Sequence, residues 1–217
     1  METLTKPKFI EPHTRAWTEA RLGKFTSSEI HKLFVSGRKK DELFGKGAIT
    51  YIQTKVAEIL TGESKNPTSI AMDWGLSNER DAILRYEQET GVKTNTSGFY
   101  IQNDIYGGSP DAEVGDDGIL EVKCPYASEN HLGIYLCNSV DELRDFEESY
   151  YTQPQGNMYI TGRQWCDFIS YDPRCYNPKF QIKIIRIYRD EEFIKELEYR
   201  VGEAAEIMNN YLQKLLQ

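Results

Sequence analysis

The sequence predicts an α/β fold in which helices flank one central mixed β-sheet. Segments with helical periodicity and segments that alternate like strands are mixed along the chain, which is typical of α/β proteins. The 217 residues suit one compact domain, and 39% hydrophobic with 28% charged residues is the balance of an ordinary globular protein. No internal repeat or long linker divides the chain. One domain is therefore expected over residues 1–217.

Three helices are predicted in the first half of the chain, over residues 26–34, about 47–60 and roughly 78–90. In the first helix, Thr26 and Glu29 have the spacing of a capping box. Gly62 and Gly91 follow the other two helices, and a glycine just past the last turn commonly ends a helix. The basic run 38–40 after the first helix predicts either a contact with a DNA backbone or an ordinary solvated loop.

The third helix carries an acid on its apolar face. Glu79 shares that face with Ile83 and Tyr86, at helical spacing. An inward-pointing carboxylate costs free energy unless a cation receives it. Glu79 is therefore a candidate site residue, and the alternative is a helix-start acid that the helix dipole favours.

Strand-like segments dominate the second half of the chain. They cover residues 98–105, 106–114, 119–124, 165–171 and 180–188. A helix over about 146–160 contains Pro154, which we expect to kink it. A long amphipathic helix begins at Asp190 and closes the chain.

Charge and cysteine usage narrow the function classes. The net charge of −8 disfavours non-specific coating of DNA, but it does not exclude a DNA enzyme, because bound cations reverse the local potential of a carboxylate site. The four cysteines form no Cys-x-x-Cys pair, so we expect reduced, mostly buried thiols rather than a zinc site. The three histidines fall in no motif and are assigned no ligand role. With no membrane-length apolar run and no signal-like start, a cytoplasmic protein is expected.

The informative stretch joins two strands through the turn 115–118. Folding back at this turn places Asp111 opposite Glu121, to within one residue of register. Directly opposed residues have Cβ atoms about 5 Å apart, so both carboxylates can reach one divalent cation. Strand alternation puts Lys123 on the same face as Glu121. Two acids and an ammonium group at one place suit hydrolysis of a phosphodiester.

An exposed hairpin with a solvated acid–base pair is the alternative, because an Asp followed by Glu-x-Lys is frequent by chance. The flanking residues are more specific, and the phrase GGSPDAEVGDDGILEVKCP resembles the core of the lambda-type phage exonucleases, in the PD-(D/E)XK nuclease superfamily. Further segments resemble the same family in the same order, at residues 21–29, 73–79, 153–155 and 171–174. The resemblance implies a restriction-endonuclease-like core for the predicted sheet.

The resemblance also assigns roles to individual residues. It implies that Asp111, Glu121 and the carbonyl of Val122 bind the metal, and that Lys123 positions the attacking water. Glu79 matches a helix carboxylate that completes the site. Gln153 matches a glutamine that holds water or phosphate, although Pro154 replaces the family's usual aliphatic residue beside it.

A pocket for a 5′-phosphate is implied at the start of the chain. Arg21 and Ser28 match the family's phosphate ligands, and the first turn of a helix with a nearby arginine is suited to bind phosphate. The alternative is a surface arginine and a capping serine. Met72 matches an apolar wedge that separates the terminal base pair, and a core methionine is the equal alternative.

Taken together, the resemblance implies a 5′→3′ exonuclease that acts on double-stranded DNA ends with Mg²⁺, which Mn²⁺ can replace. It would leave a 3′ single strand for a single-strand annealing protein and would form a trimeric ring. One rival is an endonuclease on the same core, which needs no phosphate pocket. The other is a non-catalytic DNA-end-binding module, which needs no intact acid–lysine set.

Overall fold

The computed structural model describes residues 10, 14–39, 42–64, 69–215 and 217. Its centre is a five-stranded sheet with strand order β2-β5-β6-β7-β8. The strands are β2 (Thr94–Thr96), β5 (Ala112–Val114), β6 (Gly118–Lys123), β7 (Trp165–Tyr171) and β8 (Ile182–Tyr188). The central pair β6–β7 is parallel and the other three pairs are antiparallel. The prediction of a mixed sheet in an α/β fold is confirmed.

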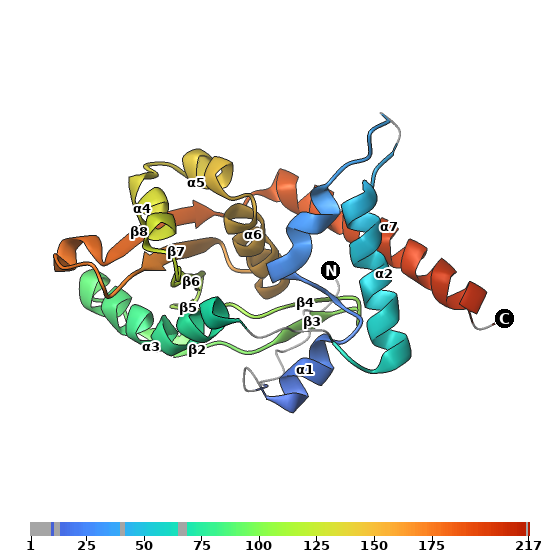
Figure 1. Cartoon of the computed structure of the whole chain (residues 1–217), viewed down its shortest axis with the longest axis horizontal. Helices are drawn as coiled ribbons and strands as arrows, with labels where there is room; N and C mark the ends of the chain where they lie inside the picture. The colour runs from blue at the N-terminus through green and yellow to red at the C-terminus, as the bar shows by residue number, and fades with distance from the viewer. Residues whose placement is uncertain (1–9, 11–13, 40–41, 65–68, 216) are drawn as a thin grey trace.

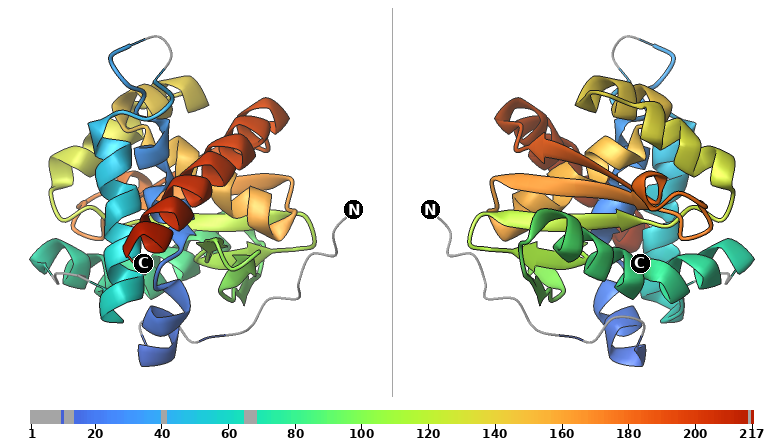
Figure 2. Two further views of the ribbon diagram at one scale, coloured as in Figure 1. Left: turned by 90° about the vertical axis from the view of Figure 1, so that its right-hand side faces the viewer. Right: turned by 90° about the vertical axis from the view of Figure 1, so that its left-hand side faces the viewer.

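Helices cover both faces of this sheet (Figure 1). The α-helices of the described residues are α1 (Arg15–Arg21), α2 (Lys46–Thr61), α3 (Ile70–Thr90), α4 (Ser128–Leu136), α5 (Val140–Phe146), α6 (Ser149–Thr161) and α7 (Glu191–Leu215). Helix α3 lies on one side, and α4, α5 and α6 lie on the other. Figure 2 shows α7 crossing α2 at the end of the molecule away from α3. No helix among the described residues combines the length and apolar character that crossing a bilayer requires.

The described part of the chain also contains a smaller sheet and two 3₁₀ helices. The sheet has the order β1-β4-β3 and consists of β1 (Phe25–Thr26), β3 (Tyr100–Gln102) and β4 (Tyr106–Gly108). The 3₁₀ helices are η1 (Ser27–Phe34) and η2 (Pro178–Phe180). Because β1 leads directly into η1 and pairs with β4, this sheet brings the start of the chain next to the segment that precedes β5.

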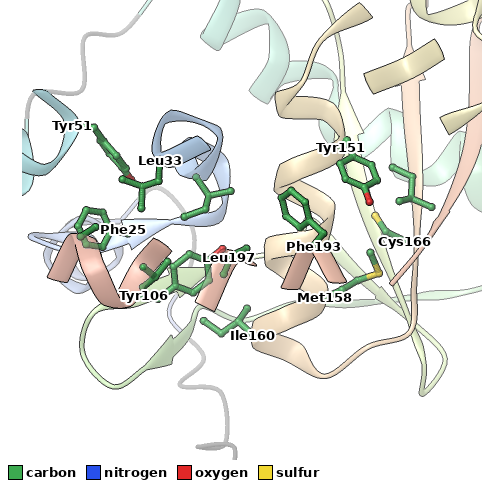
Figure 3. Packing of buried hydrophobic residues seen from close by; sticks show 14 of the residues in the cluster. Phe25, Leu33, Tyr51, Tyr106, Tyr151, Met158, Ile160, Cys166, Phe193 and Leu197 are labelled. Atoms are coloured by element: carbon green, nitrogen blue, oxygen red, sulfur yellow. The ribbon is translucent and has the colours of Figure 1, made fainter. Parts of the chain in front are cut away.

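Two hydrophobic clusters pack on opposite faces of the large sheet. On one face, Ala82 and Tyr86 of α3 pack on Leu120 and Val122 of β6. On the other, residues from η1, α2, α6 and α7 pack against alternate residues of β6, β7 and β8. Figure 3 shows part of this larger cluster, in which the ring of Phe193 lies edge-on to that of Tyr151, 5.3 Å apart. Period-2 alternation in β6 thus separates the two clusters.

The predicted capping box is wrong. Thr26 precedes η1 but makes no side-chain cap bond. Glu29 instead binds Lys32 and the buried Lys55 of α2, which lies 3.4 Å from Glu29 Oε2. The Thr26 N–H, which Glu29 would accept from in a capping box, donates instead to Tyr51 Oη at 3.2 Å. The segment forms a 3₁₀ helix rather than an α-helix.

Other element boundaries also differ from the prediction. Helix α3 begins at Ile70, with Ser69 as its side-chain cap, and not near residue 78. The strand predicted over 98–105 ends early because Asn103 and Asp104 adopt positive φ in a tight turn, which returns the chain as β4. The helix predicted over 146–160 corresponds to α6, which begins at Ser149, ends at Thr161 and continues through Pro154. Helices α1, α4 and α5 were not predicted.

The predictions for the cysteines, the histidines and the basic run 38–40 concern residues outside the site. Three cysteines are buried, Cys175 is half-buried, and all four are free thiols, as expected. His131 is a core histidine, with its ring nitrogens 2.8 Å from Ser170 Oγ and from the Phe180 carbonyl oxygen. His13 and Lys40 lie outside the described residues. Arg38 and Lys39 are exposed, as either reading of that loop requires.

Candidate active site

The β5–β6 hairpin places the first two predicted residues together. Its register pairs Ala112 with Leu120, and one further step aligns Asp111 with Glu121. The main-chain N–H of Asp111 donates to the Leu120 carbonyl at 3.1 Å. Asp111 Oδ2 accepts from the Val122 N–H at 2.6 Å. The hairpin therefore brings Asp111 against the main chain of the third predicted ligand, Val122.

Glu121 and Lys123 face helix α6, on the same side of β6, as predicted. Lys123 Nζ lies 2.7 Å from Glu121 Oε1 and donates to Gln153 Oε1 at 3.0 Å. Asn157, one helical turn after Gln153, donates from Nδ2 to Glu121 Oε2 at 3.0 Å. Glu121 is 1% exposed, so its carboxylate depends on these two donors rather than on water.

The charges of the site perturb one another. Burial raises the pKa of Asp111 well above its usual range, and the neighbouring Glu121 and Glu79 add to this rise. Burial alone would lower the pKa of Lys123, but Glu121 and Asp111 outweigh it and raise that pKa. The site thus combines crowded carboxylates, which are stabilised by a cation, with a lysine that stays charged.

Glu79 reaches the site from α3. It is half-buried, and burial, with the charge of Glu121 second, raises the pKa of its carboxyl. Ile83 and Tyr86 of the same helix pack into the smaller hydrophobic cluster, as their spacing predicted. The structure therefore brings Glu79 near Asp111, Glu121 and Lys123, although the sequence places it far from all three.

The site residues line a cleft with two connected compartments. One, of about 610 Å³, is lined by Arg21, Glu79, Asp111 and Asn157 among others, and we call it the arginine compartment. The other, of about 620 Å³, is lined by Met72, Glu121 and Lys123 among others, and we call it the lysine compartment. The two share the residues Ser28, Leu76, Glu79, Asp111 and Gln153. The predicted phosphate pocket thus adjoins the acid–lysine set.

Arg21 and Ser28 lie together in the arginine compartment. Arg21 Nη2 donates to Ser28 Oγ at 3.4 Å, and the guanidinium lies 4.2 Å from the Trp17 ring centroid and 5.8 Å from that of Phe99. Within the described part of the chain, Arg21 makes no ion pair. A guanidinium keeps its charge in proteins, so a half-buried one without a carboxylate partner is available to bind an anion.

Met72 lies in the first turn of α3 and is 49% exposed. It is therefore not a core methionine. Because it lines the lysine compartment, an apolar side chain stands at the edge of an otherwise polar cleft. This position suits contact with a base, while the wedge role itself stays a prediction.

The donor set suits a hard divalent cation bound by few protein ligands. Among the described residues, no three His, Cys, Asp or Glu side chains are placed to hold a metal ion by themselves. Mg²⁺ does not need such a group, since it usually keeps several waters and binds one or two carboxylates. Asp111 and Glu121, with the Val122 main chain beside them, fit that requirement. Burial, and after it the charges of Glu121 and Glu79, raise the pKa of Asp111, and a bound cation would offset both effects.

The sequence prediction missed Asn157 and grouped two unlike glutamines. Gln153 contacts Lys123, whereas Gln155 donates to the Tyr188 carbonyl at 2.8 Å and accepts from the Asp190 N–H at 2.9 Å, so it anchors β8 and α7. The spacing of Gln153 and Asn157, four residues apart on a helix, was the available signal for a shared face.

Comparison with known proteins agrees with this geometry. An alkaline exonuclease from Laribacter hongkongensis is 32% identical and matches 93% of this chain and 96% of its own, with a TM-score of 0.78. The same enzyme in complex with dAMP matches equally well, at 31% identity. A phage-related exonuclease from Haemophilus somnus 129PT has the same fold, with 17% identity over 88% of this chain and 96% of its own and a TM-score of 0.76. The comparison with curated proteins gave no match.

A family model covers most of the chain, and its boundaries include nearly all of the cleft. Residues 16–164 match the YqaJ-like viral recombinase domain. The matched region contains Arg21, Glu79, the β5–β6 hairpin and α6, which are the elements that build the two compartments. The resemblance to the lambda-type phage exonucleases, with their restriction-endonuclease-like fold, is thereby confirmed. The chain belongs to the YqaJ-like viral recombinase domain family.

Proposed function

We propose that this protein is a Mg²⁺-dependent 5′→3′ exonuclease that digests one strand of double-stranded DNA from its end. The observation that carries the proposal is the union of two sites in one cleft. Asp111, Glu121 and Lys123 form a set suited to phosphodiester hydrolysis. Arg21 and Ser28 form an anion pocket that shares walls with it. The relatedness to an alkaline exonuclease supports the same activity.

Each side chain has a task that its surroundings allow. Asp111 and Glu121 would hold the cation, with the Val122 carbonyl as a third ligand and Glu79 completing the site. When bound, Mg²⁺ would neutralise charge on the phosphate oxygens and lower the pKa of a water. Lys123, fixed between Glu121 and Gln153, would orient that water and stabilise the developing negative charge.

The adjoining anion pocket gives the reaction its direction. A terminal 5′-phosphate held by Arg21 and Ser28 would place the next phosphodiester near the acid–lysine set, because the two compartments share Ser28, Asp111 and Gln153. Cleavage there releases the terminal nucleotide and exposes a new 5′-phosphate for the pocket. Met72 at the rim would separate the terminal base pair. The product is a duplex with a 3′ single strand.

The test is digestion of linear duplexes labelled at the 5′ or the 3′ end, with and without a 5′-phosphate and Mg²⁺. We expect release of the 5′ label first, dependence on Mg²⁺ or Mn²⁺, and no cleavage of covalently closed circles. Asp111→Ala should abolish cleavage while DNA binding persists. Cutting of circles would favour an endonuclease, and absence of any metal-dependent cleavage would favour an end-binding module.

Two further parts of the proposal concern assembly. We propose that the 3′ strand passes to a single-strand annealing protein, which fits membership in a viral recombinase family. We also propose a trimeric ring around the DNA, in line with the resemblance. Sedimentation or light scattering of the purified protein would test the ring, and a monomer at working concentration would contradict it.

A further inference from the structure

Asn157 is a buried polar residue that lines the arginine compartment and contacts the Glu121 carboxylate. It is 0% exposed and lies on α6 one turn after Gln153. Its Nδ2 donates to Glu121 Oε2, while Lys123 Nζ donates to Oε1 of the same carboxylate. Both oxygens of Glu121 therefore have a fixed donor, which determines the rotation of the carboxylate about its last bond.

The orientation of the Asn157 amide follows from this contact. An ionised carboxylate only accepts hydrogen bonds, so the NH₂ group must face Glu121 and the carbonyl oxygen must face away. That oxygen, Oδ1, is buried and has no partner. A buried acceptor without a donor costs stability, and an apolar side chain at this position would avoid the cost. The packing of α6 alone therefore does not account for an asparagine here.

Gly108 leaves the space that Asn157 occupies. A Cβ atom at this glycine would lie 2.7 Å from Asn157 Oδ1 and 2.4 Å from Ser27 Oγ, both closer than atoms normally approach. Gly108 belongs to the Gly-Gly-Ser-Pro segment that leads into Asp111. The segment that leads into Asp111 thus also leaves space for Asn157, whose side chain contacts Glu121.

We infer that Asn157 is a positioning residue, which orients the Glu121 carboxylate and acts through it rather than on the DNA. Lys123 cannot do this alone, because its ammonium group is shared with Gln153 and flanks only Oε1. Groups that orient a metal-binding carboxylate typically contribute 10- to 100-fold to metal affinity or activity. The inference rests on the proposed nuclease function, and it adds a residue that the sequence pattern did not single out.

The experiment compares two buried amides on the same helix. Asn157→Ala should lower kcat by about 10- to 100-fold, leave KM for DNA unchanged and raise the Mg²⁺ dissociation constant of the DNA-free protein, measured by calorimetry. Gln155→Ala, which removes an amide that bonds only the main chain of β8 and the start of α7, should lower the melting temperature but not kcat. A structural role for Asn157 would make the two variants alike.

Gly108→Ala is an independent way to disturb the contact between Asn157 and Glu121. Its Cβ should displace the Asn157 amide through Oδ1 and so disturb the contact with Glu121, which should reproduce the loss of kcat. Combining it with Asn157→Ala should add little further loss, since both changes act on one contact. An unchanged kcat or an unchanged Mg²⁺ affinity in Asn157→Ala would overturn the inference while wild-type activity stands. If the wild type itself cleaves no DNA, the proposed function fails instead.

Discussion

The anion pocket offers the sharpest test of the exonuclease mechanism, through Arg21→Ala. Wild-type protein should digest a 5′-phosphorylated duplex faster than the same duplex with a 5′-hydroxyl, and the variant should lose most of that preference. The Arg21 guanidinium is already oriented by Trp17, at 4.2 Å, and by Ser28, at 3.4 Å. Binding a phosphate therefore requires little further ordering of the side chain.

The expected loss of preference for phosphorylated ends follows from the interaction that Arg21→Ala removes. A hydrogen bond to a charged group contributes roughly 1.5–3 kcal/mol, and about 1.4 kcal/mol corresponds to a factor of ten in rate. The preference for phosphorylated ends should therefore fall by about 10- to 100-fold. Arg21→Lys should restore only part of it, because an ammonium group lacks the planar two-pronged geometry that matches phosphate.

The assay measures initial rates of nucleotide release from both duplexes under one set of salt and Mg²⁺ conditions. Arg15→Ala is the matched control, since Arg15 lies on the same helix, is 91% exposed and pairs with Glu19 rather than with the cleft. The mechanism is refuted if Arg21→Ala keeps the wild-type ratio of the two rates, or if Arg15→Ala loses it equally.

Three further outcomes test other parts of the structure. Lys123→Ala should lower kcat by about 10²- to 10³-fold with DNA binding retained, and wild-type turnover in a single-turnover assay would remove Lys123 from the chemistry. Glu79→Gln should raise the Mg²⁺ concentration for half-maximal activity, and an unchanged titration would leave Glu79 a structural acid. Burial alone would raise the pKa of Asp172, but hydrogen bonds from Arg174 and Ser128 outweigh it and lower that pKa from 3.8 to about 2. The folded state then favours the ionised form, so its stabilising contribution is complete above about pH 4 and is lost as the pH falls towards 2. The difference in urea-unfolding free energy between wild type and Asp172→Asn should shrink over that range, and a constant difference would contradict it.

Local sequence patterns were sufficient to predict the part of the site that lies in the β5–β6 hairpin. Asp111, Glu121 and Lys123 lie within one hairpin, so turn position and strand alternation determine their approach. The approach of Gln153 and Glu79 depends on how α6 and α3 pack on opposite faces of the sheet, which no local pattern specifies. The family resemblance supplied the expectation for Gln153, whereas Glu79 was first singled out by its place on the apolar face of its helix.

The differences between the predicted and observed elements also have physical causes. The capping box does not form because the Thr26 N–H donates to Tyr51 Oη, from a distant helix, while Glu29 pairs with Lys32 and Lys55. Helix α3 begins earlier than predicted because the Ser69 side chain accepts from the Met72 N–H and caps the helix there. Pro154 was expected to disturb α6, but the helix continues and Gln153 still reaches Lys123. Asn157 was missed because its contact with Glu121 depends on how α6 packs on β6 and on the space beside Gly108.

Because the central sheet divides the hydrophobic interior into two clusters, assembly of the site depends on packing on both faces. Glu79 is carried by the helix on one face, whereas Gln153 is carried by the helix on the other, and Glu121 lies in the strand between them. A chain with only one face packed would hold at most part of the cleft. The proposed site is therefore complete only when helices are packed on both faces of the sheet, and in a partly folded chain the site would lack at least one of these side chains.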